Sequence, residues 1–505
     1  MKTILSKFSS WLRLPHAYLL CCATLVGCGS APVTNPNLDG KPPAMPAHAQ
    51  LLIVQATADV PVLDVWVDGE PRITALATRH GSPFVSLAAG THKLDLRLPT
   101  AAPSEPPLWS GGIYLQPGQR VLACARGRAA DSTQSSSPSR LNVIAEPLGE
   151  AVRDQRPLRI LHATPSLGSL DMMDAAQPGA SLWPALRFGH FSGYVDVATE
   201  TGSPRTELRL GLRAAGEAFD LASLIAKNDQ LASVGSAAQT AILLGDTTPL
   251  PGPAGFLGAL LLDETTGTLR ELALEPNATG PKATLYVLHA SPDVGAIDVY
   301  SKINGARLVG SLDYRQATSL LQLVPTSYPI EVRPASLPKV LLRTDLHLLP
   351  NQHWAVYLGG RQDGESSTLR LVALPRTQGN GTQTLRRAVH AIADARSDSR
   401  MTLVTTGGPS FVDPVPFAAA SPYRSGELQA EPLRLGLSGS KQTWEVDMPQ
   451  PVVDAAAKGV LAVYATGTLT DPRAPLTALA VLESSATATQ AALVIALRTT
   501  LLPNP

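Results

Sequence analysis

The chain is 505 residues long and carries 41 Lys and Arg against 41 Asp and Glu, so its formal net charge is zero with neutral histidines. A chain without a basic field has no electrostatic attraction for nucleic acid, so we expect no nucleic-acid partner. At about 100–200 residues per domain, this length predicts roughly three to five domains.

The first segment, residues 1–27, has the layout of a secretory signal. Lys2, Lys7 and Arg13 supply positive charge, and an apolar run over residues 17–26 follows them. A run of about ten residues is half of what spans a bilayer, so it is typical of a signal peptide. An uncleaved N-terminal anchor is the alternative.

The end of this run carries a second signal. Leu25, Val26 and Gly27 stand directly before Cys28. This sequence resembles the lipobox of bacterial lipoproteins, in which the cysteine thiol is alkylated by diacylglycerol and the chain is cut before it. The resemblance implies a mature protein that begins at Cys28 and is held on a membrane by acyl chains such as palmitate. Gly29 is similar to the pattern of lipoproteins sent to the outer membrane, so we expect a lipid-anchored protein of the cell envelope, on the outer membrane.

The remaining cysteines limit the chemistry of the mature part. Cys21 and Cys22 leave with the signal and Cys28 is used by lipid, so Cys124 alone remains. One cysteine can form neither an internal disulfide nor a cysteine zinc site. Cys124 stands in an apolar, strand-like run, and we expect a buried small side chain, with a reactive thiol as the alternative.

The body of the chain has the spacing of turn residues that is typical of an all-β protein. Residues 28–47 are polar, rich in Pro and unpatterned, which predicts a flexible tether. After them, short runs of Val, Leu, Ile and Thr are separated by Gly and Pro, of which the chain has 40 and 44. This pattern favours many short strands, as in sandwiches or barrels. The best helix candidates are two short segments, Phe219–Ala226 and Val452–Lys458.

The body is also repetitive. Four segments open with an apolar strand that carries Gln55, His162, His289 or His390 near its end. These positions are 107, 127 and 101 residues apart, which is one small domain each and too long for a solenoid repeat. We therefore predict four two-sheet β-sandwich modules, over residues 48–150, 156–276, 283–376 and 384–505, of which the last is divergent.

The third segment carries the most complete motif. Residues 287–300 read VLHASPDVGAIDVY, in which His289 ends one strand, Asp293 lies in a turn and Asp298 lies in the next strand. This segment closely resembles the DUF4397 domain, a bacterial extracytoplasmic module of unassigned function. The resemblance implies immunoglobulin-like sandwiches and an envelope location, and it implies no activity.

The other segments match the motif in part. The first has Asp64 in its second strand, but Gln55 stands in place of the histidine. The second keeps His162 and Asp171 and departs later, and the fourth keeps His390. The resemblance therefore covers most of the mature chain, strongly in the first and third modules and loosely in the other two.

A histidine near two carboxylates raises the question of catalysis. His289 with Asp293 and Asp298 could form a general base with its orienting partner, or half of a metal site. Alternatively, each histidine hydrogen-bonds locally at a strand end. Gln55 cannot do acid–base work at neutral pH, and Ser399 stands where the fourth module would need an aspartate. We therefore expect structural roles, with no catalytic residue, metal ligand or cofactor.

The remaining motifs add little. The chain has no Gly-x-Ser-x-Gly elbow, P-loop, Rossmann fingerprint or His-Glu-x-x-His. His347 or His353 could be a lone metal ligand, and Trp66 with Trp109 could bind carbohydrate, but packing roles are favoured. We expect a non-enzymatic binding or scaffolding array with an envelope protein or glycan as partner. The alternative is an envelope hydrolase or metal-binding protein that uses the His and Asp residues of the second and third modules.

Overall fold

The short apolar runs of the sequence form paired β-strands throughout the described part of the chain. The structure is a computed structural model that describes residues 47–503, apart from 134–136, 177, 178, 180, 201, 202, 251–254, 363–366, 380, 407–409 and 488. Segment 1–27, Cys28 and all but the last residue of the tether lie outside the described residues. The predicted all-β class of tandem sandwiches is confirmed for the rest. No helix in this part of the chain is long and apolar enough to cross a membrane.

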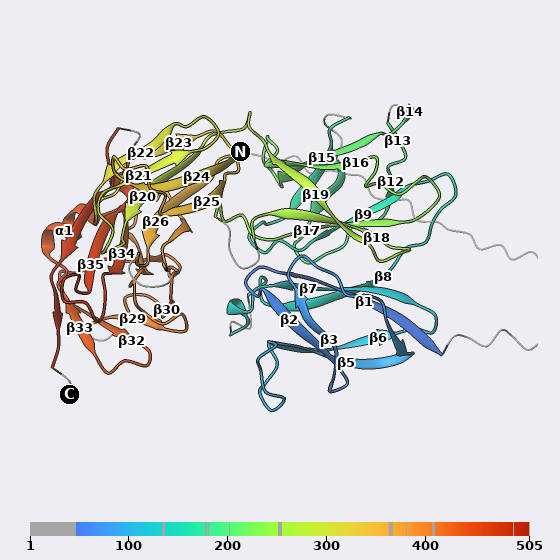
Figure 1. Cartoon of the computed structure of the whole chain (residues 1–505), viewed down its shortest axis with the longest axis horizontal. Helices are drawn as coiled ribbons and strands as arrows, with labels where there is room; N and C mark the ends of the chain where they lie inside the picture. The colour runs from blue at the N-terminus through green and yellow to red at the C-terminus, as the bar shows by residue number, and fades with distance from the viewer. Residues whose placement is uncertain are drawn as a thin grey trace, which may run out of the picture. The chain divides into compact units, whose positions relative to one another are not determined.

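The first sandwich follows the period-two pattern of its sequence. In β2 (Val62–Val67), Leu63, Val65 and Val67 are buried in one core. The other elements are β1 (His48–Thr57), β3 (Glu70–Ala77), β4 (Val85–Ala88), β5 (Gly90–Arg97), β6 (Trp109–Leu115), β7 (Arg120–Gly127), the 3₁₀ turn η1 (Ala130–Thr133) and β8 (Asn142–Pro147). They form two sheets of order β4-β1-β7-β8 and β3-β2-β5-β6, which Figure 1 shows as two layers. β1 runs parallel to β7.

The second sandwich is one continuous sheet around a single core. Its strands are β9 (Pro157–His162), β10 (Leu170–Asp174), β11 (Ser181–Leu186), β12 (Val195–Asp196), β13 (Thr199–Glu200), β14 (Ser203–Pro204), β15 (Glu207–Ala214), β16 (Ala222–Lys227), β17 (Gln239–Leu244), β18 (Gly258–Asp263) and β19 (Leu269–Pro276). Nine of them are ordered β11-β10-β15-β16-β19-β18-β17-β9-β12. The first half of β19 pairs with β18 and its second half with β16, so this strand joins the two layers.

The third sandwich repeats the plan of the first. Its strands are β20 (Ala283–His289), β21 (Ile297–Ser301), β22 (Arg307–Leu312), β23 (Leu321–Leu323), β24 (Ser327–Pro334), β25 (Leu342–His347), β26 (His353–Gly359) and β27 (Arg370–Pro375). The sheet orders are β23-β20-β26-β27 and β22-β21-β24-β25, and β20 runs parallel to β26. Strand by strand, β5, β6, β7 and β8 of the first sandwich correspond to β24, β25, β26 and β27.

The fourth sandwich has two five-stranded sheets, β31-β28-β34-β35-β36 and β30-β29-β32-β33-β37. Its elements are β28 (Leu385–His390), β29 (Arg400–Thr405), β30 (Val415–Pro416), β31 (Arg424–Ser425), β32 (Leu433–Leu437), β33 (Thr443–Val446), α1 (Gln450–Ala456), β34 (Val460–Thr466), β35 (Thr477–Leu482), η2 (Glu483–Ser485), β36 (Leu493–Leu497) and β37 (Thr499–Leu501). The expected helix over Val452–Lys458 is α1, shifted by two residues, whereas the helix expected over Phe219–Ala226 is wrong because β16 occupies that segment.

Buried side chains also join neighbouring sandwiches. Leu52 and Val54 of β1 pack with Leu161 of β9 and Ile242 of β17, so β1 is covered on both faces. Strands buried on both faces read as continuous apolar runs, which explains the openings of the four segments. The domain boundaries stay predictions, because residues 46–505 form one compact unit.

Candidate functional site

The motif position near the end of the first strand is completely buried in every sandwich. Gln55, His162, His289 and His390 have no exposed surface. Each of these side chains hydrogen-bonds to the loop that follows its own strand. The position is therefore a repeated internal contact between a strand and its loop.

Both ring nitrogens of His162 and His289 face backbone groups. Nε2 of His162 lies 2.8 Å from the carbonyl oxygen of Gly168, and Nε2 of His289 lies 3.0 Å from that of Gly295. The backbone N–H two residues further along the chain donates to Nδ1 at 3.4 Å in both sandwiches. A neutral imidazole with its proton on Nε2 satisfies both contacts.

Gln55 and His390 make the same loop contact with different groups. Nε2 of Gln55 donates to the carbonyl of Val60 at 2.7 Å. Nε2 of His390 lies 3.0 Å from Oγ of Ser399, which donates to the carbonyl of Arg396 at 2.7 Å. An amide thus replaces the imidazole in the first sandwich and keeps the hydrogen bond to the loop.

Burial keeps these histidines neutral. Desolvation lowers the pKa of His162 and of His390 to about 4. It also lowers the pKa of His289 below its ordinary value. A general base works best with a pKa near the operating pH, so these environments suit a hydrogen-bonding role better than proton transfer.

An aspartate in the second strand of each of the first three sandwiches binds the backbone of the neighbouring strand, which has a β-bulge. Each accepts a backbone N–H from a residue with positive φ, in the pairs Asp64–Ala75, Asp171–Ala185 and Asp298–Ser311, at 2.7, 2.7 and 2.8 Å. A non-glycine residue in this conformation costs of order 1 kcal/mol or more, which the charge-assisted hydrogen bond offsets. Burial acts to raise the pKa of Asp298, but the hydrogen bonds from the N–H groups of Ser311 and Ser336 hold this pKa below its ordinary value.

Asp293 belongs to a third repeated position, four residues after the motif residue. Its Oδ2 accepts the N–H of Gln362 at 2.8 Å, in the loop after β26. The equivalent residues Asp59, Ser166 and Asp394 accept N–H groups from the loops after β7, β17 and β34. Asp293 therefore ties the loop of the first strand to the loop of its parallel partner.

The structure does not join His289, Asp293 and Asp298 into one site. Each has its own backbone partners, and the ring nitrogens of His289 face Gly295 and Ser291 rather than a carboxylate. Among the described residues, no three His, Cys, Asp or Glu side chains are grouped so that they could hold a metal ion. The catalytic alternative has no assembled constellation at this motif.

A hydroxyl residue completes the motif and was missed by the sequence analysis. Oγ of Ser82 accepts the N–H of Ile53 at 3.0 Å and donates to the carbonyl of Pro83 at 2.8 Å. The same pair of hydrogen bonds recurs at Ser192, Thr318 and Ser421. These residues follow the motif residue by 27, 30, 29 and 31 positions. A Ser or Thr at this nearly constant distance was the signal available in the sequence.

The isolated histidines both have partners in the protein. The ring of His347 stacks on Phe256 with centroids 3.7 Å apart, and its Nδ1 lies 2.7 Å from Oγ of Ser327. Nδ1 of His353 lies 2.7 Å from Oγ1 of Thr284. His347 thus helps to join the second and third sandwiches.

The two tryptophans considered for carbohydrate binding and the cysteine considered as a reactive thiol all lie in the first sandwich. The guanidinium carbon of Arg97 lies 4.9 Å from the ring centre of Trp66, whereas Trp109 lines a hollow beside β6, two strands away. Cys124 is completely buried in β7, and burial raises its pKa to about 12. At neutral pH it is therefore a thiol and a poor nucleophile.

A buried ion pair joins the first two sandwiches. Nε of Arg159 lies 3.3 Å from Oε1 of Glu264, and both side chains are at most 3% exposed. The hydroxyl of Tyr194 donates to Oε2 of Glu264 at 2.7 Å. Arg159 also donates to the carbonyl of Pro147 at the end of β8. A charge of the second sandwich thus holds the last strand of the first.

The third and fourth sandwiches repeat this cluster. Arg387, three residues before His390 as Arg159 is before His162, pairs with Glu483 at 2.5 Å. Tyr423 donates to Glu483, and Arg387 donates to the carbonyl of Pro375 at the end of β27. Although burial acts to lower it, the Glu483 carboxylate holds the pKa of Arg387 above its ordinary value. The chain therefore consists of two sandwich pairs that are joined in the same way.

Comparisons with known proteins find one family, in two regions of the chain. The family model "Domain of unknown function (DUF4397)" matches residues 49–173, which run through the first sandwich into β9 and β10, and residues 283–398, which run through the third sandwich into β28. The predicted resemblance is confirmed over these residues. Among solved structures, the chain is similar to the Bacillus anthracis TIE protein at 8% identity and a TM-score of 0.14, over 76% of this chain and 63% of that chain. No curated protein matches the chain.

Proposed function

We propose that this chain, which carries DUF4397 domains in tandem, is a lipid-anchored envelope protein that works as a non-enzymatic binding or scaffolding array. One observation carries the proposal: the motif position serves as an internal hydrogen-bond donor to its own loop in all four sandwiches, and Gln55 does this as well as the histidines. A role that an amide can also fill needs no proton transfer.

The envelope location rests on the sequence. The basic start, the short apolar run and the lipobox-like residues before Cys28 support lipid attachment, and the Pro-rich tether supports a body held away from the membrane. Gly29 supports the outer membrane as the destination. A tethered chain with several weakly binding modules gains avidity by orders of magnitude through effective concentration.

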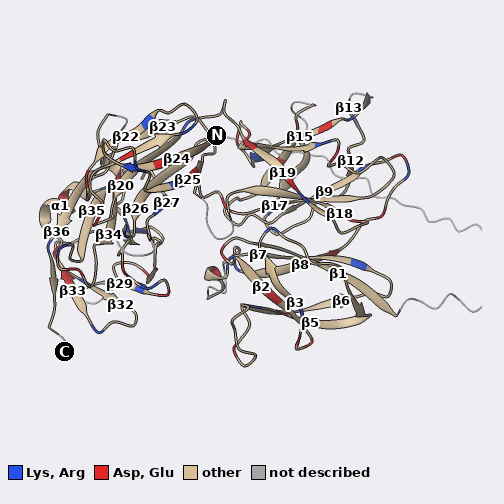
Figure 2. Cartoon of the chain, in the orientation of Figure 1, with Lys and Arg blue, Asp and Glu red and all other residues tan. Residues whose placement is uncertain are grey.

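The charge distribution supports a partner that is recognised by shape and backbone contacts. Basic and acidic residues are interspersed over all four sandwiches in Figure 2. Such a surface gives little electrostatic steering toward a polyanion or a polycation. A protein or an uncharged glycan of the envelope suits it better.

The test replaces every motif histidine by the residue of the first sandwich. We expect the His162→Gln, His289→Gln and His390→Gln triple variant to bind partners at pH 7 as the wild type does, with unchanged metal content by elemental mass spectrometry. Circular dichroism checks the fold. A stoichiometric metal or a hydrolytic activity that disappears in the folded triple variant would refute the non-enzymatic function.

A further inference from the structure

In each sandwich the edge strands of the two sheets face each other along one side. The apolar core is open to solvent there unless another part of the chain covers it. In the second sandwich β19 closes this side, because it pairs with both β18 and β16. In the fourth, β36 pairs with β35 and the directly following β37 pairs with β33. This side is thus closed by one strand shared between the sheets in the second sandwich, and by two consecutive strands, one in each sheet, in the fourth.

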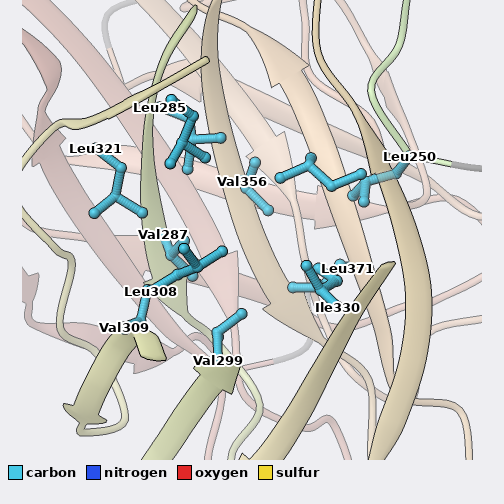
Figure 3. A pocket seen from close by; sticks show the side chains of 12 residues that line it. Leu250, Leu285, Val287, Val299, Leu308, Val309, Leu321, Ile330, Val356 and Leu371 are labelled. Carbon is cyan, nitrogen blue, oxygen red and sulfur yellow. The ribbon is translucent and has the colours of Figure 1, made fainter. Parts of the chain in front are cut away.

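The third sandwich is closed by a side chain from the second. Leu250 lies in the segment between β17 and β18, yet it is buried in the core of the third sandwich. Figure 3 shows it beside Val356, with Ile330 and Leu371 near it. About 20 Å³ of free space remains around this cluster, so Leu250 fills the opening.

Two hydrogen bonds hold the inserted segment on the edge of the third sandwich. The N–H of His347, at the end of the edge strand β25, donates to the carbonyl of Pro249 at 2.5 Å. Nε2 of Gln352 donates to the carbonyl of Thr247 at 3.1 Å, while its Oε1 accepts the N–H of Leu349 at 2.9 Å. The segment is therefore recognised by an edge-strand N–H, a glutamine amide and an apolar opening.

The first sandwich has both polar groups at the same register. Tyr114 on β6 corresponds to His347, because Tyr114 pairs with Thr91 as His347 pairs with Ser327. Gln119 corresponds to Gln352, since each directly precedes the strand parallel to the first strand. Oε1 of Gln119 accepts the N–H of Gln116 at 3.0 Å, as Oε1 of Gln352 accepts that of Leu349. The side-chain amide is thus oriented in the same way.

The apolar opening of the first sandwich is present and unfilled by described residues. Leu94, Ile113 and Val143 stand at the register positions of Ile330, Leu346 and Leu371. They line a hollow of about 280 Å³ together with Trp109 and Tyr114. Tyr114 is 65% exposed. The first sandwich therefore has the edge-strand N–H, the glutamine amide and the apolar opening of the third, but no described residue in the place of Leu250. We call this site between β6 and β8 the socket.

Two described parts of this chain lie away from the socket. The fourth sandwich has its own loop at the position of the Leu250 segment, over residues 468–475, but its Leu469 packs against the core of the fourth sandwich. Ala47, the last residue of the tether, lies beside β4, where its carbonyl accepts the N–H of Ala89, whereas the socket lies beside β8, at the opposite edge of that sheet.

We propose that the socket between β6 and β8 binds an extended peptide segment of a partner protein. The segment has an aliphatic side chain directly after a proline, as Leu250 follows Pro249, and its backbone carbonyls accept from the N–H of Tyr114 and the amide of Gln119. Main-chain bonding to an edge strand supplies affinity, and the pocket for one side chain supplies specificity. This inference deepens the binding role proposed above and rests on it for the existence of a partner.

The probe is a fluorescent peptide with the sequence of residues 245–255, titrated with the whole mature chain carrying Cys28→Ser to keep it soluble. We expect saturable one-to-one binding by fluorescence anisotropy, weakened at least tenfold when the leucine of the peptide is replaced by aspartate. Gly112→Leu should also weaken binding at least tenfold, because Gly112 lines the hollow and the nearest atom to an added Cβ is 3.9 Å away. Gln119→Ala should weaken it severalfold.

Two matched variants locate the bound peptide. Gln352→Ala alters the equivalent amide of the third sandwich, and Ile303→Ala alters a side chain that is 57% exposed elsewhere. Ile303→Ala should leave peptide affinity unchanged, and Gln352→Ala should not weaken it, because a peptide in the first sandwich does not contact Gln352. Loss of binding in Gln352→Ala, with binding kept in folded Gly112→Leu, would place the peptide in the third sandwich and overturn the proposal.

Three other results would also overturn it. A tenfold gain in affinity on deletion of residues 29–46 would make the chain's own tether the occupant. A dimer in sedimentation that the peptide dissociates would make it a second copy. Absence of peptide binding to the folded protein would remove this site while leaving the proposed function intact, because metal content and hydrolysis in the triple histidine variant test that function separately.

Discussion

Replacing His162 and His390 by glutamine should make the protein more resistant to acid. Both histidines are buried and neutral, with a pKa near 4 in the folded chain. In the unfolded chain a histidine titrates near 6.5. The unfolded state therefore takes up protons first as the pH falls, so stability is complete above about pH 6.5 and is lost progressively toward pH 4.

The size of the effect follows from the two pKa values. Between about pH 7 and pH 5, each histidine should cost the wild type about 2 kcal/mol of unfolding free energy. Gln55 shows that glutamine can keep the hydrogen bond to the loop without titrating. The double variant should therefore lose about 4 kcal/mol less than the wild type over this pH range, summed over the second and fourth sandwiches.

Urea unfolding at both pH values, followed by circular dichroism, measures this difference. Each single variant should protect only its own sandwich, which hydrogen exchange of β9 and β28 can resolve. The double His162→Ala, His390→Ala variant is the control, since it also removes the titration but loses the loop contact at neutral pH. An equal pH dependence in wild type and the glutamine variant would refute the assignment of both histidines as buried neutral donors.

Three further changes test other parts of the structure. Gly360→Ala should destabilise the third sandwich by about 2 kcal/mol or more in thermal melting, because φ is +88° and an added Cβ would lie 2.2 Å from the carbonyl oxygen of Thr368; an unchanged melting temperature would contradict this. Arg387→Leu should cost about 3–5 kcal/mol in urea unfolding by leaving the Glu483 carboxylate buried without its cation, and Arg387→Leu with Glu483→Leu should recover part of it; a single-variant cost near zero would argue against a buried pair. Cys28→Ser should move the protein from the detergent phase to the aqueous phase in a detergent-partition assay, and continued partition with membranes would argue against lipid attachment.

The sequence predicted those features that depend on neighbours along the chain. Period-two alternation in Leu63, Val65 and Val67 predicts a strand with one buried face, and the structure confirms it. The repeated strand-end residue predicts the number of sandwiches. The same local reasoning is wrong for Phe219–Ala226, where β16 lies between β15 and β19 and is buried on most of its length. A short apolar segment has no period long enough to separate helix from strand.

The candidate site was predicted in its residues but not in its contacts. Gln55, His162, His289 and His390 were identified as one repeated position, and a local structural role was favoured. Their partners are carbonyls and hydroxyls that have no sequence signature, because any residue carries a carbonyl. Ser82 was missed because its partner Ile53 lies 29 residues earlier, so that only the nearly constant spacing repeated in the other sandwiches marks it in the sequence.

What the sequence determined by itself is the all-β class and the repeat, since both depend on composition or on local spacing, whereas the export signature stays a prediction. The tertiary structure alone decided how the sandwiches close and join. Leu250 belongs by sequence to the second sandwich and by burial to the third, and Arg387 meets Glu483 across 96 residues. Such contacts form because an open apolar core must be covered and a buried charge must be paired. The groups that do this are distant in the sequence, so chain order does not specify them.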